Sequence, residues 1–207
     1  MCIWVTGFVP GGGTLPGVAP VADTISARTL LMLTTMNAQS IASDSRVLAF
    51  AEDARAYCDF IERLTKGKPP NFYADLLRLL SNLAVSGLNL PFAMPDQDVK
   101  RDSDLSHDEW SHLASAVADS IATETSALLE QHADDEAELT RATMLWDDLT
   151  DIYRDIKNGL RLFNMETPDA GLEAVWEWRF GYENHWGCDL MRALATVHEI
   201  RFFVRAD

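Results

Sequence analysis

Positive charge is scarce in this chain of 207 residues. Lys and Arg together number 17 against 32 Asp and Glu, so the formal net charge is −15. Such a surface repels the phosphate backbone of nucleic acids and the anionic head groups of lipids. We therefore expect no nucleic-acid partner and no membrane partner. The charge favours a cation or a protein partner with a basic surface.

Cysteine is also scarce, and the three cysteines, Cys2, Cys58 and Cys188, form no CxxC pair. An odd and scattered set argues against a disulfide framework, which needs an even and clustered one. The lack of close pairs argues against a thiolate zinc site. The cysteines fit small buried side chains in a reducing compartment.

Long apolar runs are missing as well. Prolines and glycines interrupt the apolar stretch near the start, which falls short of the ~20 residues that a transmembrane helix needs. No Lys or Arg precedes that stretch, as a signal peptide would require. We therefore expect a cytoplasmic protein.

The chain contains no familiar catalytic motif: GxSxG, the P-loop, the dinucleotide glycine motif and HExxH are all absent. The run Gly11-Gly12-Gly13 has no following Lys, so it does not form a phosphate cradle. These absences favour a protein without a catalytic role and without a cofactor.

Composition changes near residue 36. Residues 1–35 hold five of the 11 glycines and three of the 8 prolines, and their charged residues are Asp23 and Arg28. We expect a poorly structured N-terminal extension over residues 1–35. The alternative is a start-site artefact, with translation beginning at Met36 or Met32. The rest of the chain, residues 36–207, is predicted to be one all-α domain.

Helical periodicity dominates that domain. Apolar residues recur at intervals of three and four, and no stretch alternates with a period of two. The predicted helical segments cover about 44–64, 71–88, 106–128, 137–163 and 167–204. Ser106 with Glu109 forms a capping box, and Thr167-Pro168 is a typical helix start. The fold class is therefore all-α: a single helical bundle of about five helices with a long C-terminal helix.

Aspartates are dense on the segment 137–163, where Asp147, Asp148, Asp151 and Asp155 lie on one side of the helical wheel. Converging carboxylates can hold a divalent metal. The same side lies opposite the apolar stripe, however, so a solvated helix face explains most of the acids. Asp148 is the exception, because it borders the core and can reach a neighbouring helix.

The segment 167–204 carries charge within its apolar stripe. The wheel places Arg179 and Glu183 between Trp176 and Trp186, and charged residues seldom face a core unless they are paired. We expect Arg179 to pair with Glu183 and also with Asp148 or Asp151 on the preceding segment. Such a network either fixes helix register or lines a polar pocket between the two segments.

His185 adds a potential metal ligand. Together with Glu183 and Asp151 it could form a shell of the carboxylate-bundle kind, but the Glu-x-x-His spacing of such sites is missing. We therefore predict no metal. Three tryptophans of the same segment, Trp176, Trp178 and Trp186, are either walls of a ligand pocket or part of the core.

The two C-terminal segments together carry a signature. It combines Asp147-Asp148-Leu149 and Asp151-Ile152-Tyr153-Arg154-Asp155 with Trp176-Glu177-Trp178-Arg179-Phe180, Glu183 and His185-Trp186-Gly187. This signature resembles that of bacterial domain-of-unknown-function family 5063, whose members are short, acidic, helical proteins. The resemblance implies an all-α fold. It implies no activity and assigns no catalytic residue.

The sequence predicts a non-catalytic module for protein binding or regulation. A metal-dependent hydrolase of a nucleotide or another small phosphorylated substrate is the alternative, with Asp148, Asp151 and Glu183 converging from facing helices as metal-binding carboxylates. A pocket for a small cationic ligand is a third hypothesis. The candidate binding residues are Asp148, Asp151, Arg179, Glu183, His185, Trp176 and Trp186.

Overall fold

The computed structural model describes residues 38–41, 43–95, 99 and 106–204. The predicted N-terminal extension, residues 1–35, lies outside these residues. Within the described part the regular elements are all helices, so the prediction of an all-α fold is confirmed. Of the described helices, none combines the length and the apolar character that crossing a membrane requires.

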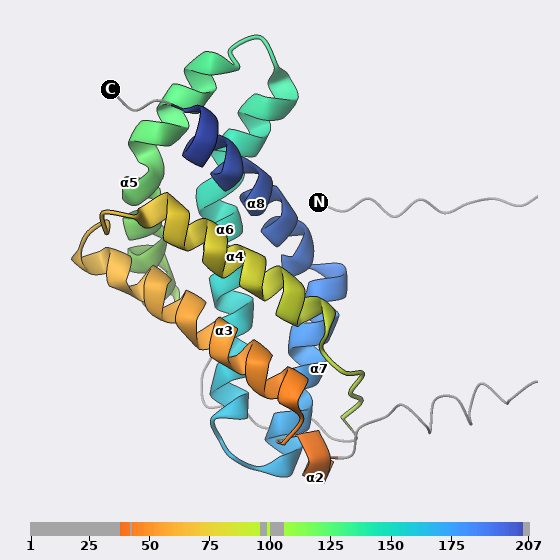
Figure 1. Ribbon diagram of the computed structural model, residues 1–207. Coiled ribbons are helices and arrows are strands. Elements are labelled where there is room, and N and C mark those ends of the chain that lie inside the picture. The colour runs from red at the N-terminus through yellow and green to blue at the C-terminus, as the bar shows by residue number, and fades with distance from the viewer. Residues whose placement is uncertain (1–37, 42, 96–98, 100–105, 205–207) are drawn as a thin grey trace, which may run out of the picture. The chain divides into compact units, whose positions relative to one another are not determined.

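Helix α6 is central to the arrangement. The elements are α2 (Ala38–Ile41), α3 (Ser45–Arg63), the 3₁₀-helix η1 (Leu64–Lys66), α4 (Phe72–Leu88), α5 (His107–Gln131), α6 (Glu136–Phe163), α7 (Pro168–Asn184) and α8 (Trp186–Phe203). Helix α6 packs against α3, α5, α7 and α8, while α4 packs against α3 and α8 (Figure 1). The core therefore lies around the apolar stripe of α6, which includes Leu145, Leu149, Ile152 and Ile156.

The helix starts follow the local capping chemistry that the sequence predicts. The Ser106 side chain accepts from the Glu109 backbone N–H, and the Glu109 carboxylate accepts from the Ser106 backbone, which completes the capping box of α5. Thr167 accepts from the Ala170 N–H, and Pro168 occupies the first position of α7. Both satisfy backbone N–H groups that a helix start leaves without partners.

The last predicted segment is divided, which corrects the expectation of one long C-terminal helix over 167–204. Helix α7 ends at Asn184 and α8 begins at Trp186, with His185 between them at φ −140° and ψ −95°. At Gly187 the backbone passes so close to the Tyr182 carbonyl oxygen that an added Cβ would lie 2.0 Å from it. Only glycine permits this turn, which sets α8 on a new axis.

The inner face of α7 is fixed by two fully buried tryptophans. Trp178 donates its indole N–H to the Ile156 carbonyl oxygen at 3.1 Å, and Trp186 donates to the Trp178 carbonyl oxygen at 3.1 Å. A Cβ at Gly159 would lie 2.1 Å from the Trp178 indole nitrogen, so this glycine lets α7 approach α6 closely. The Trp178 indole thus ties α7 to α6, and the Trp186 indole at the start of α8 ties α8 back to α7. The other side of α7 faces outward.

Candidate functional site

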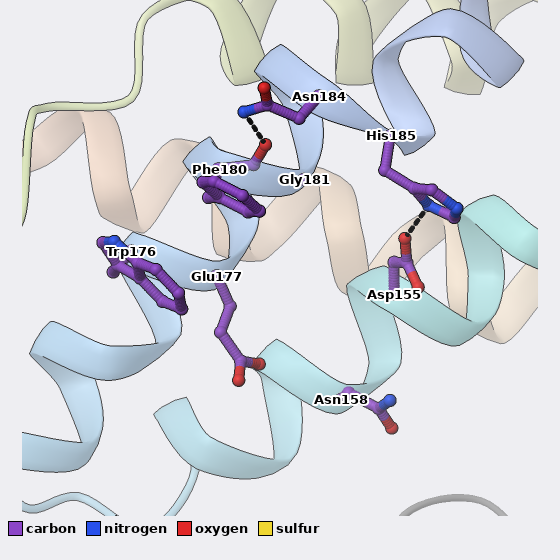
Figure 2. A pocket seen from close by; sticks show the side chains of 8 residues that line it. All are labelled: Asp155, Asn158, Trp176, Glu177, Phe180, Gly181, Asn184 and His185. Carbon is purple, nitrogen blue, oxygen red and sulfur yellow. Dashed lines mark hydrogen bonds and ion pairs between the residues drawn. The ribbon is translucent and has the colours of Figure 1, made fainter. Parts of the chain in front are cut away.

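A groove of about 480 Å³ lies between α6 and α7, at the end where α7 turns into α8. Its lining residues come from both helices and from the turn: Asp155, Asn158, Trp176, Glu177, Phe180, Gly181, Asn184 and His185. Figure 2 shows α7 supplying one side of the groove and α6 the other. The groove is large enough to hold one long side chain or a small ligand.

The α7 side of the groove is aromatic. Trp176 and Phe180 are one helical turn apart, with ring centroids 5.2 Å apart and planes inclined by 15°. Phe180 is 53% exposed, which is unusual for a large apolar ring. The exposed Phe180 ring, backed by the partly buried Trp176, offers an aromatic surface on which a planar or cationic group can rest.

The polar part of the groove is acidic. Asp155 on α6 accepts a hydrogen bond from His185 Nδ1 at 2.6 Å, with the imidazole as donor. Glu177 on α7 points toward α6, between the aromatic pair and Asp155 (Figure 2). Asn184 is turned back into its own helix, because its side-chain amide donates to the Phe180 carbonyl oxygen at 2.9 Å. Asp155 also lies 3.9 Å from Arg154 Nε. The groove is therefore lined by two carboxylates, and a cationic group in it would add to the contacts that Asp155 already makes.

A second group of acids lies between α6 and α8. Asp148 is 2% exposed and accepts from Arg192 on α8 through both carboxylate oxygens, at 2.6 Å and 3.3 Å. The same guanidinium donates to Asp189 at 2.5 Å. Burial raises the pKa of Asp148 to about 6, and the hydrogen bonds from Arg192 offset only part of that effect. The ion pair raises the pKa of Arg192, so the guanidinium stays charged.

Between these two groups lies a mixed set of potential metal ligands. Asp151 on α6, His185 at the turn and Asp189 on α8 each offer one ligand atom, and these atoms lie within 4.8 Å of one another. Asp151 also pairs with Arg154 at 2.9 Å. Burial raises the pKa of Asp151, as do the neighbouring carboxylates, while Arg154 lowers it. The set has the nitrogen and oxygen donors that Zn²⁺ or Mn²⁺ accepts.

Comparison with known proteins places the chain in a family. The family described as Domain of unknown function (DUF5063) matches residues 42–202. The chain belongs to this family. The match covers all the helices from α3 to α7 and nearly all of α8, so the groove and both acid groups fall within the DUF5063 region.

The fold of this DUF5063 chain is similar to that of a solved structure, protein BF1032 from Bacteroides fragilis. The TM-score is 0.67 at 21% sequence identity, and the alignment covers 81% of this chain and 99% of the other. At this identity the similarity shows the fold alone. No protein with a curated description matches the chain.

The structure brings some predicted site residues together. Asp151 and His185 share the potential metal set, and Trp176 lines the groove that His185 also borders. Asp148 lies beside this set but is bound to Arg192, a partner that the sequence did not indicate. Trp186, predicted as a binding residue, is fully buried and belongs to the core.

The predicted pair of Arg179 and Glu183 forms, with Arg179 donating to Glu183 at 2.9 Å. The further partner expected for Arg179, Asp148 or Asp151 inside the bundle, is wrong, because Arg179 donates instead to the Leu90 carbonyl oxygen at 2.6 Å. Glu183 is exposed, and the pair lies on the outer side of α7. The predicted convergence of Asp148, Asp151 and Glu183 is therefore wrong. The reason is the break at His185. A single helical wheel over residues 167–204 combines the buried faces of α7 and α8, and so gives the wrong buried face for α7.

Sequence reasoning missed Glu177 and Asn184 in the groove and Asp189 in the metal-capable set. The spacing of His185 and Asp189, four residues apart at a helix start, was the signal for the latter. His132, which has no evident partner in the sequence, bonds Glu199 at 2.5 Å. Its partner lies 67 residues away, so local patterns could not reveal it.

Proposed function

We propose that this DUF5063 domain is a non-catalytic binding module that docks a basic protein partner in the groove between α6 and α7. The observation that carries the proposal is the open Trp176–Phe180 stack beside the carboxylates of Asp155 and Glu177. An aromatic surface next to acids suits a cationic side chain better than any anionic or purely apolar ligand.

The charge of the whole chain supports the same conclusion. A formal net charge of −15 attracts basic surfaces over distances of about 10 Å, the screening length at moderate ionic strength. The groove then provides what long-range attraction lacks, namely a shaped contact that buries apolar area. The acidic surface as a whole would thus attract the partner, and the groove would recognise it.

Photo-crosslinking in cells tests the docking proposal. Phe180 is replaced by p-benzoylphenylalanine, and the matched control is the same replacement at Phe202, which is 58% exposed near the end of α8. We expect a discrete crosslinked protein of basic composition from position 180 and none from position 202. The adduct should disappear when Asp155→Asn and Glu177→Gln are added, because the groove then loses both charges.

Two outcomes would contradict the proposal. One is the same adduct from both positions, which would show capture by proximity rather than docking in the groove. The other is an adduct that survives the Asp155→Asn/Glu177→Gln pair, which would show that the groove acids do not select the partner. Circular dichroism of each variant verifies that the helices are intact.

A second candidate, a metal-dependent hydrolase of a phosphorylated small molecule, is favoured by the Asp151–His185–Asp189 set. A divalent ion held by two carboxylates and an imidazole could polarise a phosphoryl group or activate a water molecule. Asp155 would then act as the carboxylate that orients the imidazole through Nδ1. This assignment replaces Glu183, which the sequence had suggested as a ligand.

Thermal melting decides the second candidate. The chain is melted first in EDTA and then with Mn²⁺ or Zn²⁺ added. An ion that binds the folded chain raises the midpoint of thermal unfolding by mass action. We expect a saturable shift if the set binds metal, lost in Asp189→Asn and retained in Glu183→Gln. A shift that both variants retain would assign the metal to scattered surface acids, and the hydrolase candidate would be abandoned.

A further inference from the structure

Helices α4 and α8 differ from the rest of the bundle in the charge they expose. Among the described residues of these two helices, no exposed position is Asp or Glu. Each of the other long helices, α3, α5, α6 and α7, exposes at least one acid: Glu52, Asp119, Glu136 and Glu183. A chain with 32 acidic residues thus has one two-helix surface without exposed carboxylates.

Large apolar side chains occupy this surface instead. Val85 and Leu88 on α4 are 64% and 73% exposed, and Met191 and Phe202 on α8 are 49% and 58% exposed. Exposed apolar residues that are scattered singly are common on proteins, whereas a contiguous group of them marks an interaction surface. The question is therefore whether these residues adjoin one another.

The two helices pack against each other and run antiparallel (Figure 1). Gly87 near the end of α4 lies against the Trp186 indole at the start of α8. Tyr73 at the start of α4 lines one pocket with Arg201 near the end of α8. The exposed turns of α4 and α8 therefore lie beside each other along most of their length.

The edges of the two helices along this contact are apolar as well. At 100° per residue, Leu88 lies about 60° from Val85, on the side of α4 that turns toward α8. Half-buried Leu194 likewise lies about 60° from Met191, on the side of α8 that turns toward α4. The exposed apolar residues of the two helices therefore form one continuous surface.

The exposed stripe of α8 is complementary to itself. Met191, Ala195, His198 and Phe202 follow at spacings of four, three and four residues, so they lie on one side of the helix. This spacing is the same in reverse. When two copies of α8 pair antiparallel about the middle of the stripe, Met191 lies opposite Phe202 and Ala195 lies opposite His198. A small side chain then meets a ring, and a thioether meets an aromatic ring, which is a favourable contact.

Charge indicates what covers this surface. Two chains of formal net charge −15 repel each other where their acidic faces meet, and a surface without exposed carboxylates avoids that repulsion. A basic protein gains nothing there, because the exposed ionisable residues described on α4 and α8 are Arg78, His198 and Arg201. An anionic lipid surface would repel the rest of the chain. The charge pattern therefore favours a second copy of this chain.

The size of the surface fits a weak dimer. Helices of 17 and 18 residues are about 25 Å and 27 Å long, and two neighbouring helices about 10 Å wide present roughly 500 Å². Two copies would bury roughly 1,000 Å² in total, which is the size of weak and transient interfaces. We therefore expect association in the micromolar range and dissociation on dilution.

We propose that the chain forms a reversible dimer through the α4–α8 face, with the two copies of α8 antiparallel at its centre. The α4–α8 face consists of Val85, Leu88, Met191, Ala195, His198 and Phe202. A two-fold axis makes the same surface serve on both copies, as in most protein dimers. None of these residues lines the groove between α6 and α7, so the proposal is independent of the proposed function.

Sedimentation velocity of the full chain in EDTA, from about 1 to about 200 µM, tests the dimer. We expect the weight-average sedimentation coefficient to rise with concentration. Ala195→Glu places an acid at the centre of the interface, twice in a symmetric dimer, and should weaken association at least about tenfold. The matched control Ala122→Glu adds the same charge at an exposed alanine of α5 and should change association less than about twofold. Circular dichroism verifies that both variants keep their helices.

Photo-crosslinking tests the antiparallel arrangement. With p-benzoylphenylalanine in place of Phe202, we expect an adduct with a second copy of the chain, linked at a peptide that contains Met191. This adduct should be lost in Ala195→Glu and retained in Ala122→Glu. It joins two acidic chains, so position 202 keeps its use as the control for a basic partner in the groove.

Several results would overturn the proposal. One is a sedimentation coefficient that stays at the monomer value at every concentration, and another is association that Ala195→Glu leaves unchanged. An adduct from position 202 to a different protein, or to residues 1–37 of the same chain, would show that another occupant covers the face. An adduct with a second copy far from Met191 would exclude the antiparallel pairing. Absence of the basic adduct at position 180 would contradict only the groove, so the two proposals fail separately.

Discussion

Helix α6 directs acids at two neighbours, and the two contacts are built differently. Toward α8 it places Asp148, which is 2% exposed and closed by a bidentate bond from Arg192. Toward α7 it places Asp155, whose side chain is 25% exposed and lies at the edge of the groove. The first contact buries its acid with a guanidinium, whereas the second pairs Asp155 with His185 and Arg154 at a solvent-exposed edge beside an aromatic surface.

The difference separates structure from recognition. A carboxylate that is buried with its counter-charge helps to set the register of two helices, and removing one partner leaves an uncompensated charge inside the protein. A carboxylate at an open groove costs little to maintain, because water solvates it together with its charged neighbours. The same residue type on one helix thus serves two roles according to what the neighbouring helix supplies.

The largest expected effect comes from opening the closed contact. Arg192→Gln should lower the free energy of unfolding by about 3 kcal/mol at neutral pH, because Asp148 then stays buried without its guanidinium. Urea unfolding at pH 7 measures this change. The matched variant Arg179→Gln removes a guanidinium from the outer side of α7 and should cost less than about 1 kcal/mol.

Equal losses in the two variants would break the comparison, because the two arginines are similarly exposed and differ in their partners: the Asp148 side chain is 2% exposed and that of Glu183 is 53% exposed. The comparison would become sharper if the loss of unfolding free energy in Arg192→Gln were smaller at pH 5 than at pH 7. At that pH Asp148 is largely protonated in the folded state, and a neutral carboxyl needs no counter-charge.

Much of the fold could be predicted because its signals are local. Apolar periodicity, the Ser106 capping box and the Thr167-Pro168 start depend on residues a few positions apart. The break at His185 could not be predicted in this way. It depends on the close approach of Gly187 to the Tyr182 carbonyl oxygen, and a glycine within a helical period gives no sign of such a contact.

The same limit applies to the site. Trp176 was identified because it belongs to the apolar stripe of its segment, whereas Asp151 and His185 were identified because a carboxylate and an imidazole are potential metal ligands. The pairing of Asp148 with Arg192 spans 44 residues and three helices, so no pattern within one helix contains it. The buried side of α7 could not be predicted while residues 167–204 were taken as one helix. For this reason Arg179 was wrongly placed in the core.

The next effect is the pH dependence that the closed contact creates. The folded pKa of Asp148 is about 6 against an ordinary value of 3.8, so between these values the folded chain binds more protons than the unfolded one. Stability from this group therefore decreases as pH rises from about 4 to 6, by roughly 2–3 kcal/mol, and is constant above that range. Asp148→Asn should remove the dependence.

The measurement is the difference in unfolding free energy between the wild type and Asp148→Asn across this pH range. Taking this difference removes the contributions of the titratable groups that both chains share. One of them is Asp44, whose pKa is lowered by its hydrogen bonds with Arg46 and whose contribution to stability therefore changes with pH in the opposite direction. A difference that does not vary with pH would mean that Asp148 stays ionised throughout. The environment of Asp148 at α8 would then penalise its charge no more than the groove penalises that of Asp155.

The smallest effect is expected at the open contact. Phe180→Ser removes a ring that is 53% exposed, so the free energy of unfolding should change by less than about 1 kcal/mol. Trp178→Ala, two residues earlier on the buried side of α7, should cost about 3–5 kcal/mol because it leaves a cavity against α6. Urea unfolding compares the two. If Phe180→Ser is as costly as Trp178→Ala, the aromatic wall is part of the core and is not available to a ligand.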